Sequence, residues 1–424
     1  MKIKQVLIYC LLLTGSRLVA QDKPTLTLEQ CYAAASANSP LAQQKALTIV
    51  AGNMAEKNQN LKWLPQVDLN AQATYQSAVT SFPAKLPGVT VDELSKDQYK
   101  GTLDIVQPVY DGGIINTQKK LQHATTNVES QRVEVDLYQL KLKVNGYFFT
   151  ALLMEENIRL MNLAKEDLDN NIKKVSAQAV NGIATNSYVD VLKAELLKTS
   201  QKIIEFNAIR KAAMQMLEIL TGTAIAENTS FVKPAGGAAN AGDEAADRPE
   251  LKLFDFQKQQ FQLQSKLISA RSNPKLSFFA NGGYGKPGLN MLKNEFQWFY
   301  LGGVKLSIPI TSQFTKQREQ RVIKIQEQIV DRQKENFLNN NRQLLVQQKS
   351  EVEKYRELVS MDTEIVSLRK KIREKASVRL ANGISTSSDY ITELNAENQA
   401  MLTQKLHEIQ LLQSQYNYKL ILGK

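Results

Sequence analysis

The chain has 424 residues, of which 43% are hydrophobic, and a formal net charge of +11 at pH 7. Acidic residues are interleaved with the basic ones along predicted helices, and an export signal is predicted at residues 1–20, so the charge does not indicate nucleic-acid binding. The mature chain keeps a single cysteine, Cys31, which excludes an internal disulfide; its two histidines, His123 and His407, stand alone in helical patterns rather than in a metal site.

Residues 1–20 are predicted to be a secretory signal peptide. A charged start with Lys2 and Lys4 is followed by an apolar run that ends at Leu13. This run is too short to cross a bilayer as a helix. Its removal also removes Arg17 and lowers the formal net charge from +11 to +8.

Helix and strand patterns alternate in the next part of the chain. A helix is predicted over residues 40–63 and a strand over 66–78, where apolar and polar residues alternate from Val67 to Gln76. A second strand is predicted over 99–110, after a polar loop. A period of two gives each strand one apolar and one polar face.

A very long helix is predicted over residues 112–180, because no proline occurs between 109 and 233 and apolar residues recur every seven positions. The residues of this stripe are Ile114, Leu121, Val128, Val135, Leu142 and Phe149. The helix would rise about 1.5 Å per residue, or roughly 100 Å in all. Asn181-Gly182 suits a turn with positive φ, and a helix is expected to return over 187–221.

The second half of the chain repeats this order. Pro108 and Pro309 are separated by the same number of positions as Gly182 and Gly383. The elements predicted there are a helix over 250–272, strands over 275–284 and 297–310, a helix over 312–381, a turn at Asn382-Gly383, and a helix over 388–421. We therefore expect a first repeat over 21–222, a flexible linker over 223–248, and a second repeat over 249–424.

Four aromatic residues gather in the predicted strands of the second repeat. They are Phe278, Trp298, Phe299 and Tyr300. One interpretation is core packing, and the other is the interfacial aromatic belt of a membrane barrel.

The strands have a length that suits tilted membrane strands, but there are only four of them. Membrane barrels need about eight strands, and an open sheet edge is not tolerated in lipid. Either the strands lie outside a membrane or several chains share one barrel. In the second case the barrel should pass into a helical tube at Pro108 and Pro309.

Several segments together resemble the TolC-like outer-membrane efflux proteins, and the resemblance covers nearly all of the mature chain. The segments are Leu26-Thr-Leu-Glu-Gln30, Asn38-Ser-Pro-Leu41, Gln107-Pro-Val-Tyr-Asp-Gly-Gly113, Val180-Asn-Gly-Ile-Ala-Thr185 and Ala381-Asn-Gly-Ile-Ser-Thr386. The resemblance implies a mainly α fold with a small β part, built from a duplicated strand–long-helix hairpin. Three chains would form a twelve-stranded outer-membrane β-barrel continued by a periplasmic α-helical barrel.

The function implied by the resemblance is that of a passive exit duct in the outer membrane of a Gram-negative bacterium. The duct would serve a tripartite efflux or type I secretion system. Its implied partners are two further copies of the chain, a periplasmic adaptor, an inner-membrane transporter and outer-membrane lipid. No cofactor and no enzymatic activity are expected.

The resemblance also assigns site residues at the two helix tips. The tips that dock on the adaptor would be formed by Asn181, Gly182, Ile183, Thr185, Asn382, Gly383, Ile384, Ser385 and Thr386. Asp190, Asp389 and Glu393 would line the periplasmic aperture and could select cations. The alternative for Asp389 is a first-turn residue favoured by the helix dipole. Arg373, Lys375 and Arg379 either face solvent or pair at the tip.

Two other classes of protein remain in view. An envelope-spanning coiled-coil adaptor or structural protein would also carry a long helical hairpin, although it would not need two copies with their own alternating strands. An enzyme would need a convergent polar site. The sequence holds no Ser/His/Asp set, metal cluster or phosphate loop, and Gly282-Gly-Tyr-Gly285 ends a strand without a following helix.

Overall fold

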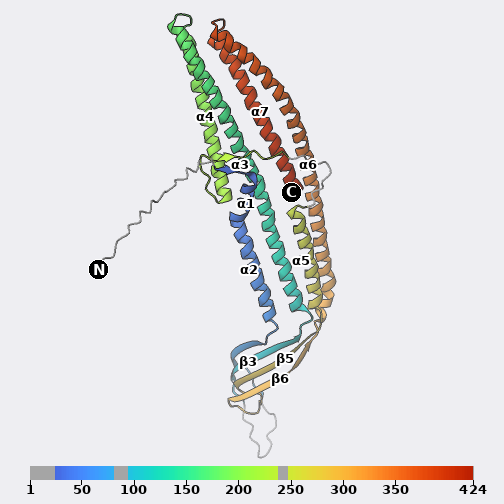
Figure 1. The fold of residues 1–424 in the computed structure, drawn as a ribbon. Helices are drawn as coiled ribbons and strands as arrows, with labels where there is room; N and C mark the ends of the chain where they lie inside the picture. Colours follow the sequence, from blue (N-terminus) through green and yellow to red (C-terminus); the bar gives the residue numbers. More distant parts are fainter. Residues whose placement is uncertain (1–23, 81–93, 237–246, 424) are drawn as a thin grey trace, which may run out of the picture. The chain divides into compact units, whose positions relative to one another are not determined.

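The computed structural model describes residues 24–80, 94–236 and 247–423. Its helices are α1 (Leu28–Asn38), α2 (Pro40–Leu61), α3 (Ile114–Val180), α4 (Asn186–Thr221), α5 (Pro249–Arg271), α6 (Ile310–Ala381) and α7 (Ser387–Leu422) (Figure 1). Its strands are β1 (Thr25–Leu26), β2 (Gln66–Tyr75), β3 (Asp97–Tyr110), β4 (Ser230–Phe231), β5 (Lys275–Lys286) and β6 (Gln297–Ser307). The predicted class, mainly α with a small β part, is confirmed, whereas the predicted signal peptide lies outside the described residues.

Contacts divide the chain into two compact units, and each takes residues from both sequence repeats. The tip unit comprises Met1–Asn38, Leu140–Ala239 and Lys349–Asn417, and the sheet unit comprises Ser39–Gln139, Asn240–Gln348 and Tyr418–Lys424. Among the described residues, the search for helices long and apolar enough to span a bilayer finds none.

The sheet unit is built around four antiparallel strands in the order β2-β3-β5-β6. Pro309 lies at the junction itself, since β6 ends at Ser307 and α6 begins at Ile310. Pro108 instead lies inside β3, where the pairing with β5 shifts register before Tyr110. Proline lacks the N–H that a regular ladder needs, so a register shift is a place where it is tolerated.

The junction between β3 and α3 is the turn Asp111-Gly-Gly113. Gly112 and Gly113 have φ values of 75° and 86°, in the left-handed region that glycine adopts without strain. The carboxylate of Asp111 accepts hydrogen bonds from the backbone N–H groups of Gly113 (2.9 Å) and Ile115 (2.5 Å). A side-chain acceptor there satisfies amides that have no partner in the first turn of the helix.

The tip unit has an apolar core that includes elements missed in the sequence. Leu28 and Cys31 of α1 pack with Phe148 of α3, and burial raises the pKa of the Cys31 thiol to about 12. Strands β1 and β4 pair in parallel, and they bring Phe231 into the same core. The expectation of a flexible surface linker over 223–248 is therefore wrong for its described part around Phe231, because burial of this aromatic side chain fixes the segment.

Each long helix of the tip unit returns as a hairpin. Gly182 and Gly383 have φ values of 73° and 70°, as the turn prediction requires. The two hairpins share a second apolar cluster. Its buried members are Leu168, Val175, Val189, Leu192, Leu380, Tyr390 and Leu394.

Candidate functional site

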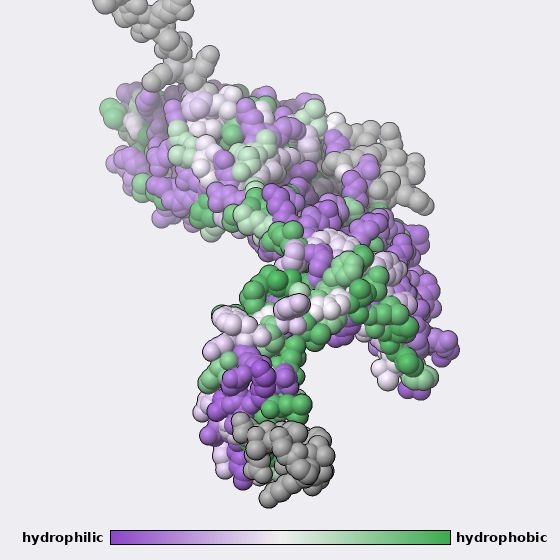
Figure 2. Space-filling view, turned by 90° about the horizontal axis from the view of Figure 1, so that it is seen from below, coloured by the Kyte–Doolittle hydropathy of each residue, from purple (hydrophilic) through white to green (hydrophobic). Residues whose placement is uncertain are grey.

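One face of the sheet is apolar and exposed. The paired register places Leu69, Leu103 and Gly282 side by side on this face, and their neighbours at every second position share it. Leu69 and Trp298 are each 82% exposed and Tyr300 is 88% exposed. Figure 2, which looks at the molecule from below, shows apolar and polar residues next to one another at the surface. A contiguous exposed apolar surface like this face of the sheet marks contact with a partner or a membrane.

Aromatic side chains on this face form a cluster at the end of the sheet away from the helix junctions. The ring centroid of Tyr284 lies 5.5 Å from that of Phe296 and 4.9 Å from that of Trp298, and Tyr99 lies 6.3 Å from Phe296. Tyr99, Tyr284 and Phe296 were not singled out in the sequence. The two-residue period and the cross-strand pairing could have found the tyrosines.

The four predicted aromatic residues do not share one place. Trp298 and Tyr300 lie on the apolar face at this far end, whereas Phe278, opposite Val304, lies near the helix junction. Phe299 is on the opposite face, where it is 9% exposed beneath the ammonium group of Lys100, 4.9 Å from its ring centroid. Its assignment as a membrane-interface residue is wrong, because adjacent residues of a strand point to opposite faces.

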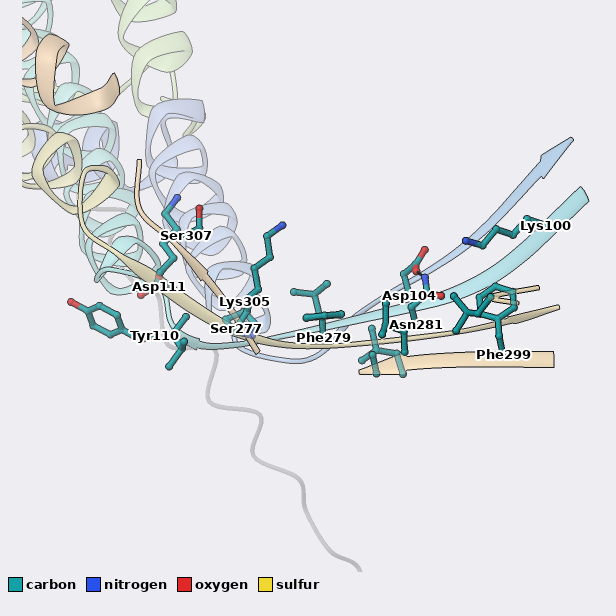
Figure 3. Close-up of a pocket in the computed structure, with 18 residues that line it drawn as sticks. Lys100, Asp104, Tyr110, Asp111, Ser277, Phe279, Asn281, Phe299, Lys305 and Ser307 are labelled. Carbon is teal, nitrogen blue, oxygen red and sulfur yellow. Dashed lines mark hydrogen bonds between the residues drawn. The ribbon is translucent and has the colours of Figure 1, made fainter. Parts of the chain in front are cut away.

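The other face of the sheet is polar and carries hydrogen-bonded charges. The carboxylate of Asp104 accepts hydrogen bonds from Asn70 (2.6 Å), from Thr102 (3.1 Å) and from Asn281. A pocket of about 740 Å³ opens on this face. Figure 3 shows Lys100, Asp104 and Lys305 on this side of the strands. A sheet that is apolar on one side and polar on the other is the pattern of a water-filled membrane barrel wall.

Strands β2 and β6 form the two edges of the sheet. Exposed apolar stripes lie on the helices that continue from these edges. Helix α2 precedes β2 and exposes Leu47, Val50, Met54 and Leu61. Helix α6 follows β6 and exposes Phe314, Val322, Ile325 and Ile329. At each edge of the sheet, an unpaired strand edge is therefore accompanied by an apolar helix face.

The predicted tip residues lie in and beside the two turns. Asn181, Gly182, Ile183, Thr185, Asn382, Gly383 and Ile384 are exposed, and Ser385 and Thr386 are half-buried. Ile183 and Ile384 are each 67% exposed at corresponding positions of the two hairpins. Each turn thus carries an exposed isoleucine at the same position.

The three predicted aperture acids differ in their surroundings. Asp190 is exposed on α4. Asp389 caps α7: its carboxylate accepts hydrogen bonds from the backbone N–H (3.0 Å) and hydroxyl (2.8 Å) of Thr386, and these bonds lower the pKa of Asp389. Glu393 is half-buried and lies 3.5 Å from Arg369. The structure thus gives Asp389 the first-turn position of the alternative hypothesis.

Asp389 and Glu393 also line a groove of about 530 Å³ between α6 and α7, with Lys375 and Arg379 on its other wall. Oε2 of Glu393 is buried and accepts no hydrogen bond among the described residues. Opposite charges therefore face one another across this groove near the second turn.

A buried polar network joins the two hairpins just below the turns. The hydroxyl group of Tyr390, which is fully buried, donates a 2.5 Å hydrogen bond to Asp167 and accepts one of 3.0 Å from Asn171. Arg373 binds Glu397 at 2.6 Å and lies 3.9 Å from Asp167. We call these five residues the hairpin latch. Pairing is therefore the interpretation that holds for Arg373.

Electrostatics stabilise the latch in its present protonation state. Burial acts to lower the pKa of Arg373, but the hydrogen bond to Glu397 and the negative charges of Glu397 and Asp167 together outweigh it, and the pKa is raised. Burial, and then the hydrogen bond to Asp167, raise the pKa of Tyr390. The arginine is thus charged and the tyrosine is a neutral donor at ordinary pH.

Sequence reasoning did not identify Asp167, Asn171, Tyr390 or Glu397. Asp167 and Tyr390 are 223 positions apart, so no local pattern connects them. Within the described ranges, no group of three or more His, Cys, Asp or Glu side chains could hold a metal ion.

Comparison with known proteins adds to this geometry. The family model described as outer membrane efflux protein matches residues 31–223. No curated protein sequence matches the chain. The chain is similar to the solved structure of CusC, with a TM-score of 0.71, 12% identity, and coverage of 93% of this chain and 92% of that chain.

Two further solved structures give the same result. The Campylobacter jejuni CmeC outer membrane channel has a TM-score of 0.67 and 14% identity, with coverage of 93% of this chain and 85% of that chain. The outer membrane protein VceC from Vibrio cholerae has a TM-score of 0.67 and 13% identity, with coverage of 93% and 96%. At these identities the structural likeness shows a shared fold.

Proposed function

This chain belongs, through residues 31–223, to the outer membrane efflux protein family, and from that premise we propose that it is the outer-membrane exit duct of a tripartite efflux or type I secretion system. The single observation that carries the proposal is the two-faced sheet, whose apolar face is exposed in the isolated chain. In a bilayer this face contacts lipid and the polar face lines the water-filled path. A periplasmic adaptor would have no use for such a face.

The duct is a homotrimer that shares one barrel. One chain supplies four strands, and three chains supply the twelve that the family resemblance implies. Edge β6 of one copy pairs with edge β2 of the next, because an unpaired edge is not tolerated in lipid. The apolar stripes of α2 and α6 support this arrangement, since they continue from the same two edges and need a partner.

Cargo passes through the duct passively. An inner-membrane transporter supplies the driving force, and a periplasmic adaptor docks on the tips around Gly182 and Gly383. The paired exposed side chains of Ile183 and Ile384 are suited to such contact. The helices continue the barrel as a tube in the periplasm.

The hairpin latch closes the tip at rest. Its bonds join α3 of the first hairpin to α6 and α7 of the second, so separation of the hairpins must break them. Buried groups left without partners cost about 1–3 kcal/mol each, which is enough to hold a closed state. Adaptor binding would offset this cost.

The proposal is tested by fractionation, mass and conductance. We expect the mature protein in the outer-membrane fraction, a trimeric mass in mild detergent, and ion-conducting channels in planar bilayers. A soluble periplasmic protein would contradict the lipid-facing sheet. A monomeric mass in detergent would contradict the shared barrel.

A further inference from the structure

The polar face of the sheet carries two lysines next to the helix junctions. Lys275 of β5 pairs with Ser307 of β6, and Lys305 of β6 pairs with Ser277 of β5. Cross-strand partners share a face, so the two ammonium groups lie diagonally on the same side of the sheet. Figure 3 shows Lys305 with Ser277 and Ser307 at this end of the pocket.

An apolar pair lies in the next row outward. Val106 of β3 pairs with Phe279 of β5, and Gly303 of β6 continues the row without a side chain. Both Val106 and Phe279 line the 740 Å³ pocket together with the two lysines. This volume is within the range of roughly 300–1,000 Å³ that is usual for small-molecule sites.

The acids of the pocket are already bonded to other groups. Asp111 accepts hydrogen bonds from the backbone at the start of α3, and Asp104 accepts them from Asn70, Thr102 and Asn281. Neither Lys275 nor Lys305 is among the donors of these hydrogen bonds. The serines beside the lysines are neutral and can act as additional hydrogen-bond donors.

We propose that this pocket binds an organic anion that carries an apolar group. The anionic group lies between Lys275 and Lys305, and the apolar group packs on Phe279 and Val106. The inference rests on the proposed function and deepens it, because it names a class of cargo. Three copies would place six lysines around the path where the barrel meets the helices, and such rings favour anions.

A cationic cargo fits this part of the wall less well. The row beyond Phe279 carries two acids on this face, Asp68 and its cross-strand partner Asp104, and of the two it is Asp104 that lines the pocket. Its carboxylate is occupied by three neutral donors. A cation on the apolar row would therefore have the two lysines on one side and a bonded carboxylate on the other.

The test uses the full mature chain in planar bilayers and two matched probes. One probe is 2-naphthalenesulfonate, and the other is the naphthylmethyl-trimethylammonium cation, which has the same aromatic group. We expect the sulfonate to block conductance at about one tenth of the concentration that the cation needs. The double variant Lys275→Gln/Lys305→Gln should lose this preference.

Two further variants separate the charged and apolar parts of the site. Phe279→Ser should weaken the block by both probes. Lys293→Gln changes a loop lysine that pairs with Glu295, and this variant should be blocked by the probes as the wild type is. A double variant that conducts and is blocked like the wild type would overturn the inference, as would a wild type that neither probe blocks. If the wild type forms no channels, the proposed function itself fails.

Discussion

Tyr390 of α7 donates a 2.5 Å hydrogen bond to Asp167 of α3, although the two residues are 223 positions apart. The bond joins the second hairpin of the tip unit to the first. Tyr390 is fully buried, so water cannot replace its partner while the hairpins stay together. Asn171 and Arg373 complete the contact from α3 and α6. Together with the 2.7 Å hydrogen bond that Gln178 donates to the backbone carbonyl of Ala381, it links the two hairpins near the turns.

Replacing Tyr390 with Phe should weaken the closed state that we propose for the tip. The variant keeps the aromatic ring but leaves the carboxylate of Asp167 and the amide of Asn171 without the hydroxyl group. We expect the free energy of unfolding to fall by about 1–3 kcal/mol and the mean bilayer conductance to rise. Tyr188→Phe, in the same apolar cluster, is the control and should change neither. If the stability fell but the conductance did not change, Tyr390 would have a structural role and no role in closing the tip.

Alkaline pH should act on the same bond. The pKa of Tyr390 is raised above its ordinary value of 10.0, chiefly by burial and then by the hydrogen bond to Asp167. Because the pKa is raised in the folded state, the stability that protonated Tyr390 contributes is fully present below about pH 10 and is lost as the pH rises through the folded-state pKa. The melting temperature should therefore fall more steeply above pH 10 in the wild type than in Tyr390→Phe. If the melting temperatures of the two proteins fell equally with pH, ionisation of Tyr390 would not be coupled to unfolding.

The sheet was largely predictable because its information is local. Alternation from Val67 onward predicts a face, and the structure confirms that Leu69 lies on the apolar side, opposite Leu103. Phe299 was misassigned because its position among aromatic neighbours outweighed its place in the two-residue period. Gly182 and Gly383 were predictable for a similar reason, since a positive φ at a helix end favours glycine.

The latch was not predictable because its partners meet only after the two hairpins pack. Nothing beside Asp167 in the sequence distinguishes it from the exposed acids of the same helix. Likewise α1 and the β1–β4 pair are too short to give a clear periodic pattern, and only the burial of Leu28 and Phe231 shows their place in the core. Tertiary contact decided both cases, and it overrides local preference.

A single lysine should distinguish the two faces of β2. Leu69→Lys places a charge on the face proposed to contact lipid, where the cost is about 2–4 kcal/mol near the bilayer centre. We expect a strong loss of trimer from the outer-membrane fraction. Gln72→Lys, three positions along the same strand, lies on the polar face and should assemble normally. Equal loss in both variants would mean that the two faces are not separated by lipid.

The tip acids should influence ion selectivity if they line an aperture. Hydrogen bonds from Thr386 hold the pKa of Asp389 below its ordinary value of 3.8, so its contribution to stability is present above that value and is lost as pH falls. At neutral pH the double variant Asp190→Asn/Asp389→Asn should therefore shift the reversal potential in a salt gradient toward a weaker cation preference. Glu166→Gln, an exposed acid of α3 away from the turns, is the control. An unshifted reversal potential would restrict Asp389 to its capping role.

The exposed stripe of α6 should be needed for assembly but not for folding of one chain. Ile325 is 55% exposed in the isolated chain and lies on the helix that continues from the β6 edge. Burial of this side chain against a second copy would contribute about 1.5–3 kcal/mol per contact, and Ile325→Glu would replace it with a charge that must be desolvated. We expect monomers with unchanged helical circular dichroism in mild detergent. Gln328→Glu introduces the same charge at an exposed polar position of α6 and should remain trimeric. Trimers of Ile325→Glu with normal heat stability would place the interface between copies on another helix face.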